Sequence, residues 1–196
     1  MAAGRSDKVY LWLGLSGVLI GLGIIFTIRN RRKIVKFSES LKGQTEIARN
    51  AGFTNREFER LMGEVGWKPG DAWCVYFVKL VWYNMAPEYL KKKILSKVSG
   101  STWQTWENLK GDANFKISAI PMAGDMAIWR MYKNGEPTWD GHAGIVKKLG
   151  YGTFTTVEGN TTNKGGDEGY IVAEKTRPID YTVNNGLRLV GFIRFA

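Results

Sequence analysis

The N-terminal region is dominated by one long apolar segment. Residues 9–28 contain no charged side chain and are bounded by Lys8 and Arg29. An α-helix rises 1.5 Å per residue, so a segment of about twenty residues crosses the ~30 Å hydrocarbon core of a bilayer. The pattern therefore predicts one transmembrane helix over about residues 9–28. A cleavable signal peptide is the alternative, but residues 27–30 offer no small-residue cleavage site.

The apolar residues that follow recur mainly at helical spacing. Residues 37–66 carry apolar positions separated by charged ones, which predicts helical structure. Asp71 is placed to cap a further helix over residues 72–84, whose apolar side chains cover nearly its whole circumference. A helix of that kind is expected in the centre of a domain. Residues 91–110 are expected to add further helices or loops.

The pattern changes after Pro121 to short apolar and polar alternations separated by glycines and turn residues, which is typical of strands. The predicted strands cover residues 125–132, 142–149, 154–158, 170–176 and 187–195. Helices first and an antiparallel sheet afterwards predict an α+β fold, with the N-terminal helices packed on the sheet.

The formal net charge of +10 is concentrated near the apolar segment. Residues 1–36 hold seven Lys or Arg and one acidic residue, whereas residues 37–196 hold 21 and 17. Basic residues beside an apolar helix bind lipid headgroups, so this distribution favours a membrane over a nucleic acid as the partner. We therefore expect a membrane segment of residues 1–36, a folded domain of residues 37–196, and no nucleic-acid partner. Gly17 and Gly21 have the spacing of a face for helix-mediated self-association, or they simply dilute the apolar character of the helix.

The chain contains one cysteine and one histidine, which narrows its possible chemistry. A disulfide within the chain and a zinc site built from His and Cys are excluded by this count. No Asp-x-Asp-x-Gly calcium loop occurs, so we expect no metal and no cofactor. Cys74 follows Asp71 in the first turn of a predicted helix, where the helix dipole favours a thiolate. For an isolated cysteine in an apolar helix, a place in the core is the more common role.

The surroundings of the histidine favour a catalytic role for this cysteine. His142 lies between small residues at the start of a predicted strand, where a substrate can approach. Strand alternation places Glu158 and Asn160 on one face of the next strand. If residues 150–152 form the loop between the two strands, His142 lies opposite Asn160 and diagonal to Glu158. Either polar side chain can hold the imidazole in a nucleophile–base–orienter triad, with Glu158 favoured as its direct partner.

Five segments of the sequence together resemble a known family. They are residues 70–78, 121–129, 141–146, 157–161 and 190–194. These segments contain Trp-Cys, Gly-His and Glu-Gly-Asn elements in this order. Roughly residues 45–196 therefore resemble the CHAP domain. This family comprises the cysteine- and histidine-dependent amidohydrolases/peptidases of the papain-like superfamily. The resemblance implies a papain-like fold for the α+β domain. It also implies Cys74 as the nucleophile, His142 as the base, and Glu158 and Asn160 as the orienting residues.

The same resemblance implies that the substrate is peptidoglycan and that the chain cuts one of its amide bonds. The activity would be that of an N-acetylmuramoyl-L-alanine amidase or an endopeptidase, and the protein would be a phage endolysin or another cell-wall lytic enzyme. Two alternatives stay open: a catalytically silent, membrane-anchored module that binds the wall or scaffolds an assembly, and a cysteine amidase that acts on a non-wall peptide. We expect a single-pass membrane protein whose domain faces the wall. The five basic residues between Arg29 and Lys36 argue against this orientation, because cytoplasmic flanks carry the excess of Lys and Arg.

Overall fold

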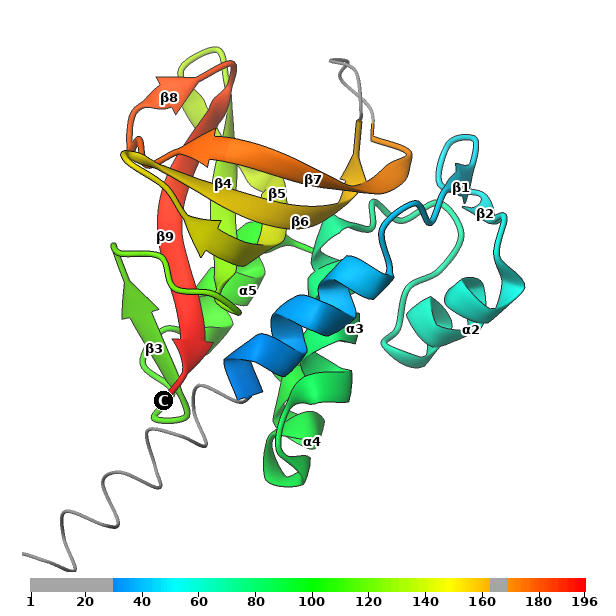
Figure 1. Cartoon of the computed structure of the whole chain (residues 1–196). Coiled ribbons are helices and arrows are strands. Elements are labelled where there is room, and N and C mark those ends of the chain that lie inside the picture. Colours follow the sequence, from blue (N-terminus) through cyan, green and yellow to red (C-terminus); the bar gives the residue numbers. More distant parts are fainter. Residues whose placement is uncertain (1–29, 163–168) are drawn as a thin grey trace, which may run out of the picture.

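The structure is a computed structural model that describes residues 30–162 and 169–196. Helices pack against an antiparallel sheet (Figure 1), so the predicted α+β class is confirmed. Residues 30–40 are helical. The elements that follow are β1 (Glu46–Ile47), β2 (Gly52–Phe53), α2 (Arg56–Glu64), α3 (Cys74–Met85), α4 (Glu88–Lys97), α5 (Thr102–Leu109), β3 (Phe115–Ser118), β4 (Met126–Lys133), β5 (Glu136–Leu149), β6 (Thr153–Thr161), β7 (Ile171–Pro178), β8 (Val183–Asn184) and β9 (Leu187–Phe195).

Within the described residues, the main sheet has the strand order β3–β9–β4–β5–β6–β7, and β8 pairs with β9 outside this path. All of these neighbours run antiparallel. The five predicted strands are present, although β5 begins at Glu136, before the predicted start at His142. The sequence pattern does not predict β3, because only Phe115 of its four residues is buried. A short edge strand of this kind leaves little alternation to detect.

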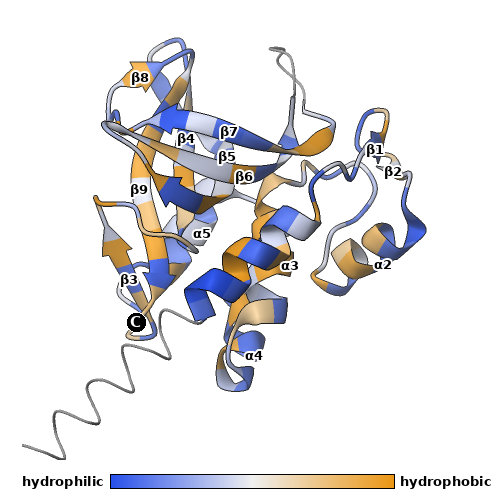
Figure 2. Cartoon of the chain, viewed as in Figure 1, coloured by the Kyte–Doolittle hydropathy of each residue, from blue (hydrophilic) through white to orange (hydrophobic). Residues whose placement is uncertain are grey.

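Helix α3 is the buried centre of the domain, as its uniformly apolar sequence predicts. Eight of its twelve residues are buried, among them Phe77, Leu80 and Trp82. In Figure 2 the ribbon of α3, coloured mostly as hydrophobic, lies behind the more hydrophilic helix of residues 30–40. On the sheet side, α3 shares one core with Ile145 of β5 and Val157 of β6. This packing fixes the first residue of α3 relative to the strands.

The predicted helical structure over residues 37–66 is wrong in its middle part. Residues 41–55 form turns and the short β1–β2 pair, and α2 begins only at Arg56. Arg49 and Asn50 have φ values of 62° and 57°, which a right-handed helix does not allow. Phe53 packs at ring distances of 4.7 to 5.0 Å against three other aromatic rings. Tertiary packing of this ring outweighs the helical spacing of the local sequence.

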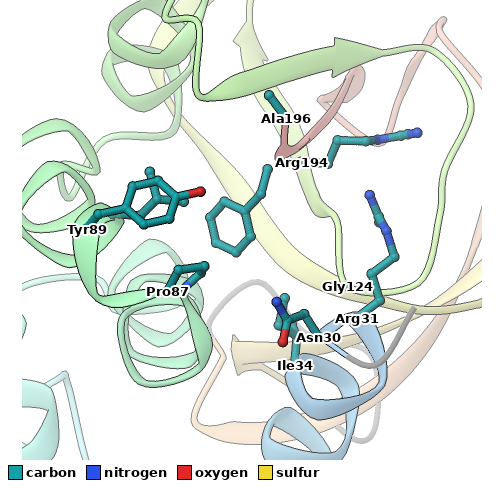
Figure 3. Close-up of a pocket in the computed structure, with 10 residues that line it drawn as sticks. Asn30, Arg31, Ile34, Pro87, Tyr89, Gly124, Arg194 and Ala196 are labelled. Atoms are coloured by element: carbon teal, nitrogen blue, oxygen red, sulfur yellow. The ribbon is translucent and has the colours of Figure 1, made fainter. Parts of the chain in front are cut away.

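The helix of residues 30–40 is joined to the sheet by a buried cluster of charges. Asp125, directly before β4, is fully buried. Its carboxylate lies 2.8 Å from Nη1 of Arg31 and 2.7 Å from Nη2 of Arg194 in β9. Figure 3 shows Arg31 and Arg194 at one edge of a cavity of about 270 Å³. Two cations therefore share one buried carboxylate and connect this helix to two strands.

The backbone of the same helix lies close to the turn before β4. Gly124 has a φ of 86°, and a Cβ added there would lie 3.4 Å from the backbone of Arg31. Ile34, one turn later, belongs to the main core. The domain boundary expected between residues 36 and 37 thus falls inside a helix that packs on the domain.

The predicted transmembrane helix, residues 9–28 with Gly17 and Gly21, lies outside the described residues. Among the residues that are described, no helix combines the length and apolar character needed to cross a membrane.

Two truncated proteins would measure how much residues 30–36 contribute to the fold. Deleting residues 1–36 removes Arg31 and Ile34, whereas deleting residues 1–29 keeps both. We expect the shorter protein to lose about 2–4 kcal/mol of unfolding free energy relative to the longer one, because a buried ion pair and a buried aliphatic side chain are lost. Urea unfolding of the two proteins measures the difference. Equal unfolding midpoints would show that residues 30–36 do not stabilise the domain.

Candidate active site

Cys74 is the first residue of α3, and it is only 6% exposed. The residue before the helix is Trp73, and no side chain caps this helix start. The predicted cap by Asp71 is wrong, because the helix begins three residues later and a capping residue must directly precede it. The Asp71 carboxylate instead accepts a hydrogen bond from the Tyr76 hydroxyl at 3.2 Å. The first N–H groups of α3 therefore lack a side-chain acceptor beside the cysteine.

His142 lies on β5, opposite Trp129 of β4. Its Nε2 is 2.8 Å from Oε2 of Glu158 on β6. The Cys74 side chain lies close enough to the imidazole to raise the pKa of His142. Because Nε2 is occupied by Glu158, Nδ1 is the nitrogen left for the sulfur. The structure thus brings Cys74, His142 and Glu158 into one connected chain of contacts.

Glu158 is fully buried, and both of its oxygens accept several hydrogen bonds. Arg177 of β7 donates from Nε to Oε1 at 2.9 Å and from Nη2 to Oε2 at 2.6 Å. The Thr156 hydroxyl donates to Oε1 at 2.5 Å, and the Thr161 hydroxyl donates to Oε2 at 3.4 Å. A buried carboxylate needs such partners, because burial without them is costly. These contacts hold the Glu158 carboxylate in one position beside the imidazole of His142.

The charges of these three side chains depend on one another. Burial alone lowers the pKa of His142, but the charge of Glu158 and hydrogen bonds to Cys74 and Glu158 raise it to about 9. Burial raises the pKa of Glu158, but His142 and Arg177 outweigh burial and hold that pKa below its usual value. Burial likewise lowers the pKa of Arg177, and Glu158 more than compensates. At neutral pH the site therefore holds an imidazolium, a carboxylate and a guanidinium.

Asn160 occupies a different place from the one that strand alternation predicts. Its φ is 51°, and the β6–β7 register shifts between Glu158 and Thr161, so the alternation is interrupted at this residue. One orientation of the Asn160 side-chain amide satisfies both its oxygen and its nitrogen. In that orientation the oxygen accepts a hydrogen bond from the Trp73 backbone N–H at 3.3 Å, and the nitrogen donates to the Gly169 carbonyl at 2.5 Å. Asn160 therefore binds the residue before Cys74, while Glu158 is the partner of the imidazole.

The close approach of β6 to α3 depends on Gly159, between these two polar residues. A Cβ at this position would lie 2.5 Å from Cβ of Phe77 and 2.7 Å from the Trp73 ring. Real Cβ atoms essentially never come this close to other atoms, so any larger residue would push the strand off the helix. The glycine is thus needed to keep Glu158 and Asn160 beside the start of α3.

The sequence pattern alone does not identify Arg177 as part of this site. Arg177 lies on β7, and its partner Glu158 pairs with Ala173 of the same strand. The long connection between β6 and β7 leaves this register undetermined in the sequence, whereas a short turn would fix it. The signal that is present in the sequence is a pair of cations two residues apart, with Lys175 inside the predicted strand of residues 170–176 and Arg177 directly after it.

No group of three or more potential metal-ligating side chains occurs within residues 30–162 and 169–196. Of the tryptophans near the site, Trp73 and Trp129 are buried, whereas Trp139 is 63% exposed. Trp73 also donates its indole N–H to Glu46 at 2.6 Å. Only Trp139 of these three therefore offers an open ring surface to a ligand.

Comparison with known protein families agrees with the resemblance seen in the sequence. The CHAP domain family model matches residues 66–160, so that resemblance is confirmed. The crystal structure of a wild-type endolysin, LysIME-EF1, aligns with a TM-score of 0.46 at 17% sequence identity. The alignment covers 84% of this chain and 63% of the endolysin chain, which is less than two thirds of that protein's length. No curated protein matches the sequence.

The charge of His142 can be measured directly, because it is the only histidine in the chain. We expect its ring NMR signals to titrate with a midpoint of about 9 in the unmodified protein. Glu158→Gln keeps the shape of the side chain but removes its charge. Burial is then opposed only by Cys74, so the midpoint should fall clearly below 9. The matched control is Glu57→Gln, which removes an exposed carboxylate on α2 and should leave the midpoint unchanged. A midpoint that stays near 9 in Glu158→Gln would mean that Glu158 does not set the histidine's charge.

Proposed function

We propose that the chain is a cysteine-dependent hydrolase that cuts an amide bond in peptidoglycan. The observation that carries this proposal is the position of His142, whose Nε2 lies 2.8 Å from Oε2 of Glu158 and whose pKa the nearby Cys74 raises. The match to the CHAP domain over residues 66–160 supports an amidohydrolase or peptidase. Peptidoglycan is the substrate that the family resemblance implies. The domain would adopt the papain-like fold of that family.

The reaction would begin with the Cys74 proton already transferred to His142, so that a thiolate faces the imidazolium present at neutral pH. Glu158 favours this transfer because its charge stabilises the imidazolium that results. The thiolate then attacks the carbonyl carbon of the scissile amide, forming a carbon–sulfur bond and an oxyanion. Arg177 holds the carboxylate in place with two hydrogen bonds, so the imidazole keeps one orientation during this step.

The oxyanion would be stabilised at the uncapped start of α3. The first N–H groups of a helix have no partners within it, and the helix dipole adds positive potential there. Asn160 accepts from the Trp73 N–H, so the donors that remain for a ligand are those of Cys74 and the residues after it. Removing one such donor typically costs a factor of about 10²–10³ in rate in other enzymes.

The second half of the reaction reverses the proton transfer. The imidazolium of His142 protonates the leaving amine as the carbon–nitrogen bond breaks, which leaves an acyl group on the Cys74 sulfur. Water, deprotonated by the neutral imidazole, then attacks the thioester carbonyl. The carbon–sulfur bond breaks, which releases the acid and restores the Cys74 thiolate beside the imidazolium. The same histidine thus acts as acid and base in turn. Whether the enzyme is an N-acetylmuramoyl-L-alanine amidase or an endopeptidase depends on which amide reaches the thiolate.

For localisation, we propose a membrane tether formed by residues 9–28, with the domain on the side of the cell wall. The uncharged length of this segment and its basic flank support a tether. Gly17 and Gly21 would supply the face for self-association. An anchored lytic enzyme of this kind would act as an endolysin or a cell-wall hydrolase.

Replacement of the nucleophile tests the proposed activity. Cys74→Ala and Cys74→Ser should each abolish release of new chain ends from purified sacculi, and His142→Ala should have a similar effect because the two act as a unit. Ser40→Ala, an exposed change on the helix of residues 30–40, serves as the control. Mass spectrometry of the products identifies the bond that is cut. Undiminished hydrolysis by Cys74→Ala would refute the cysteine mechanism. An unmodified protein that leaves sacculi intact but cuts soluble peptides would point to a non-wall substrate.

A further inference from the structure

Two arginines stand directly opposite each other on neighbouring strands of the main sheet. Arg130 of β4 pairs with Arg188 of β9 in the antiparallel ladder. Like charges at directly opposite positions destabilise a sheet. Neither guanidinium forms an ion pair with a carboxylate in the part of the chain that the structure describes. The repulsion between them is therefore not relieved by an acidic side chain of these residues.

Both guanidinium groups are nevertheless held in place. Arg130 donates from Nε to the Thr138 carbonyl at 2.8 Å, and its guanidinium carbon lies 3.8 Å from the centre of the Trp103 ring. Arg188 donates from Nε to the Tyr181 carbonyl at 2.8 Å. Arg188 also donates from Nη1 to the Tyr132 hydroxyl at 3.3 Å. The remaining terminal N–H groups of both side chains are left to bind another acceptor. Because the side chains are already ordered, little conformational entropy would be lost on binding.

The two arginines line a cavity of about 200 Å³. Its walls include the aromatic rings of Trp103, Tyr132 and Tyr181. Along β4, Arg130 directly follows Trp129, the residue that pairs with His142. Strand alternation places the Arg130 side chain on the face opposite to Trp129.

The other cavity, beside Arg31 and Arg194, differs in its charge. There the two guanidinium groups share the buried carboxylate of Asp125, so part of their charge is already neutralised. At Arg130 and Arg188 no such carboxylate is paired within residues 30–162 and 169–196. The cavity lined by Arg130 and Arg188 is therefore the one whose positive charge favours binding of an anion.

We infer that the cavity between Arg130 and Arg188 binds an anionic group of the cell-wall polymer, a carboxylate or a phosphate. Guanidinium groups bind both oxyanions through paired N–H donors, and such charge-assisted bonds are stronger than neutral ones. The aromatic walls suit the apolar faces of sugar or peptide next to the anion. This inference rests on the proposed function for the identity of the polymer. It assigns to the cavity the task of holding the wall strand while an amide is presented to Cys74.

Anion binding is measured first, with inorganic phosphate as the probe. The full chain with Cys74→Ala, in mild detergent, is titrated with phosphate against chloride at equal ionic strength, and the thermal midpoint is followed. Arg130→Gln and Arg188→Gln should each weaken phosphate binding about tenfold or more. The matched control is Arg56→Gln, an equal charge change at an exposed position on α2, which should leave binding unchanged. Equal phosphate binding by all three variants would overturn the inference.

Sedimentation with purified sacculi then identifies the source of the anion. The same variants should bind sacculi about tenfold more weakly than the parent and the Arg56→Gln control. If sacculi stripped of phosphate polymers lose the arginine-dependent part of binding, the ligand is a wall phosphate. If sacculi with amidated carboxylates lose it instead, the ligand is a peptide carboxylate. Sacculus binding that is insensitive to both arginines would overturn the assignment to the wall polymer.

Hydrolysis by the chain with Cys74 intact separates this inference from the proposed function. If Arg130→Gln and Arg188→Gln leave binding unchanged while the protein still cuts sacculi, the inference is wrong and the proposed function stands. If phosphate binds through the two arginines but the unmodified protein does not cut sacculi, the proposed function is wrong and the cavity remains an anion site without a role at the wall.

Discussion

Glu158 carries its charge without contact with solvent, and the arrangement of the site depends on how that charge is compensated. Its two oxygens accept hydrogen bonds from His142, Arg177 and two threonine hydroxyls. Removing any strong donor would leave part of a buried charge without a partner, which typically costs several kcal/mol. The carboxylate therefore holds β5, β6 and β7 in a fixed relation. The same contacts determine the charge and the direction of the imidazole.

A second buried carboxylate has a parallel role directly before β4. Asp125 is bound by Arg31 and Arg194, so it ties the helix of residues 30–40 to β4 and β9. In both places one buried acid is shared by two cationic side chains from different elements. Asp125 connects the segment that follows the proposed membrane tether to the strand that carries Trp129, the neighbour of His142. In each cluster, around Glu158 and around Asp125, the paired cations hold the buried carboxylate at a fixed position inside the domain.

The sequence predicts those features that depend on local pattern. The apolar circumference of α3 predicts its burial, and the loop of residues 150–152 joins β5 and β6 as expected. A bulge between Val146 and Lys148 shifts the ladder by one residue, so that Ile145 pairs with Val157 and the histidine and glutamate meet. Without both the loop and the bulge, the register would not bring His142 of β5 next to Glu158 of β6.

Features that depend on distant residues are not visible in the sequence pattern. Arg31 and Asp125 are 94 positions apart, and no local rule links a basic residue after an apolar segment to an acid before a strand. The basic flank therefore looks like a set of lipid anchors, although Arg31 is bound inside the domain. The capping role expected of Asp71 fails for a related reason, since tertiary contacts of Trp73 and Tyr76 decide where α3 begins. Arg177 is likewise placed by a strand register that no short turn fixes.

The central claim is that Glu158 acts through His142 on the reactivity of Cys74. The rate of alkylation by iodoacetamide at pH 7 tests this claim most directly, because Cys74 is the only cysteine in the chain. The account predicts that His142→Ala and Glu158→Gln each slow the reaction at least about tenfold, the factor that corresponds to one pKa unit. It predicts no change for Glu57→Gln, and intact folding of each variant is checked by circular dichroism. Alkylation of the folded Glu158→Gln protein at the rate of the unmodified chain would contradict the account.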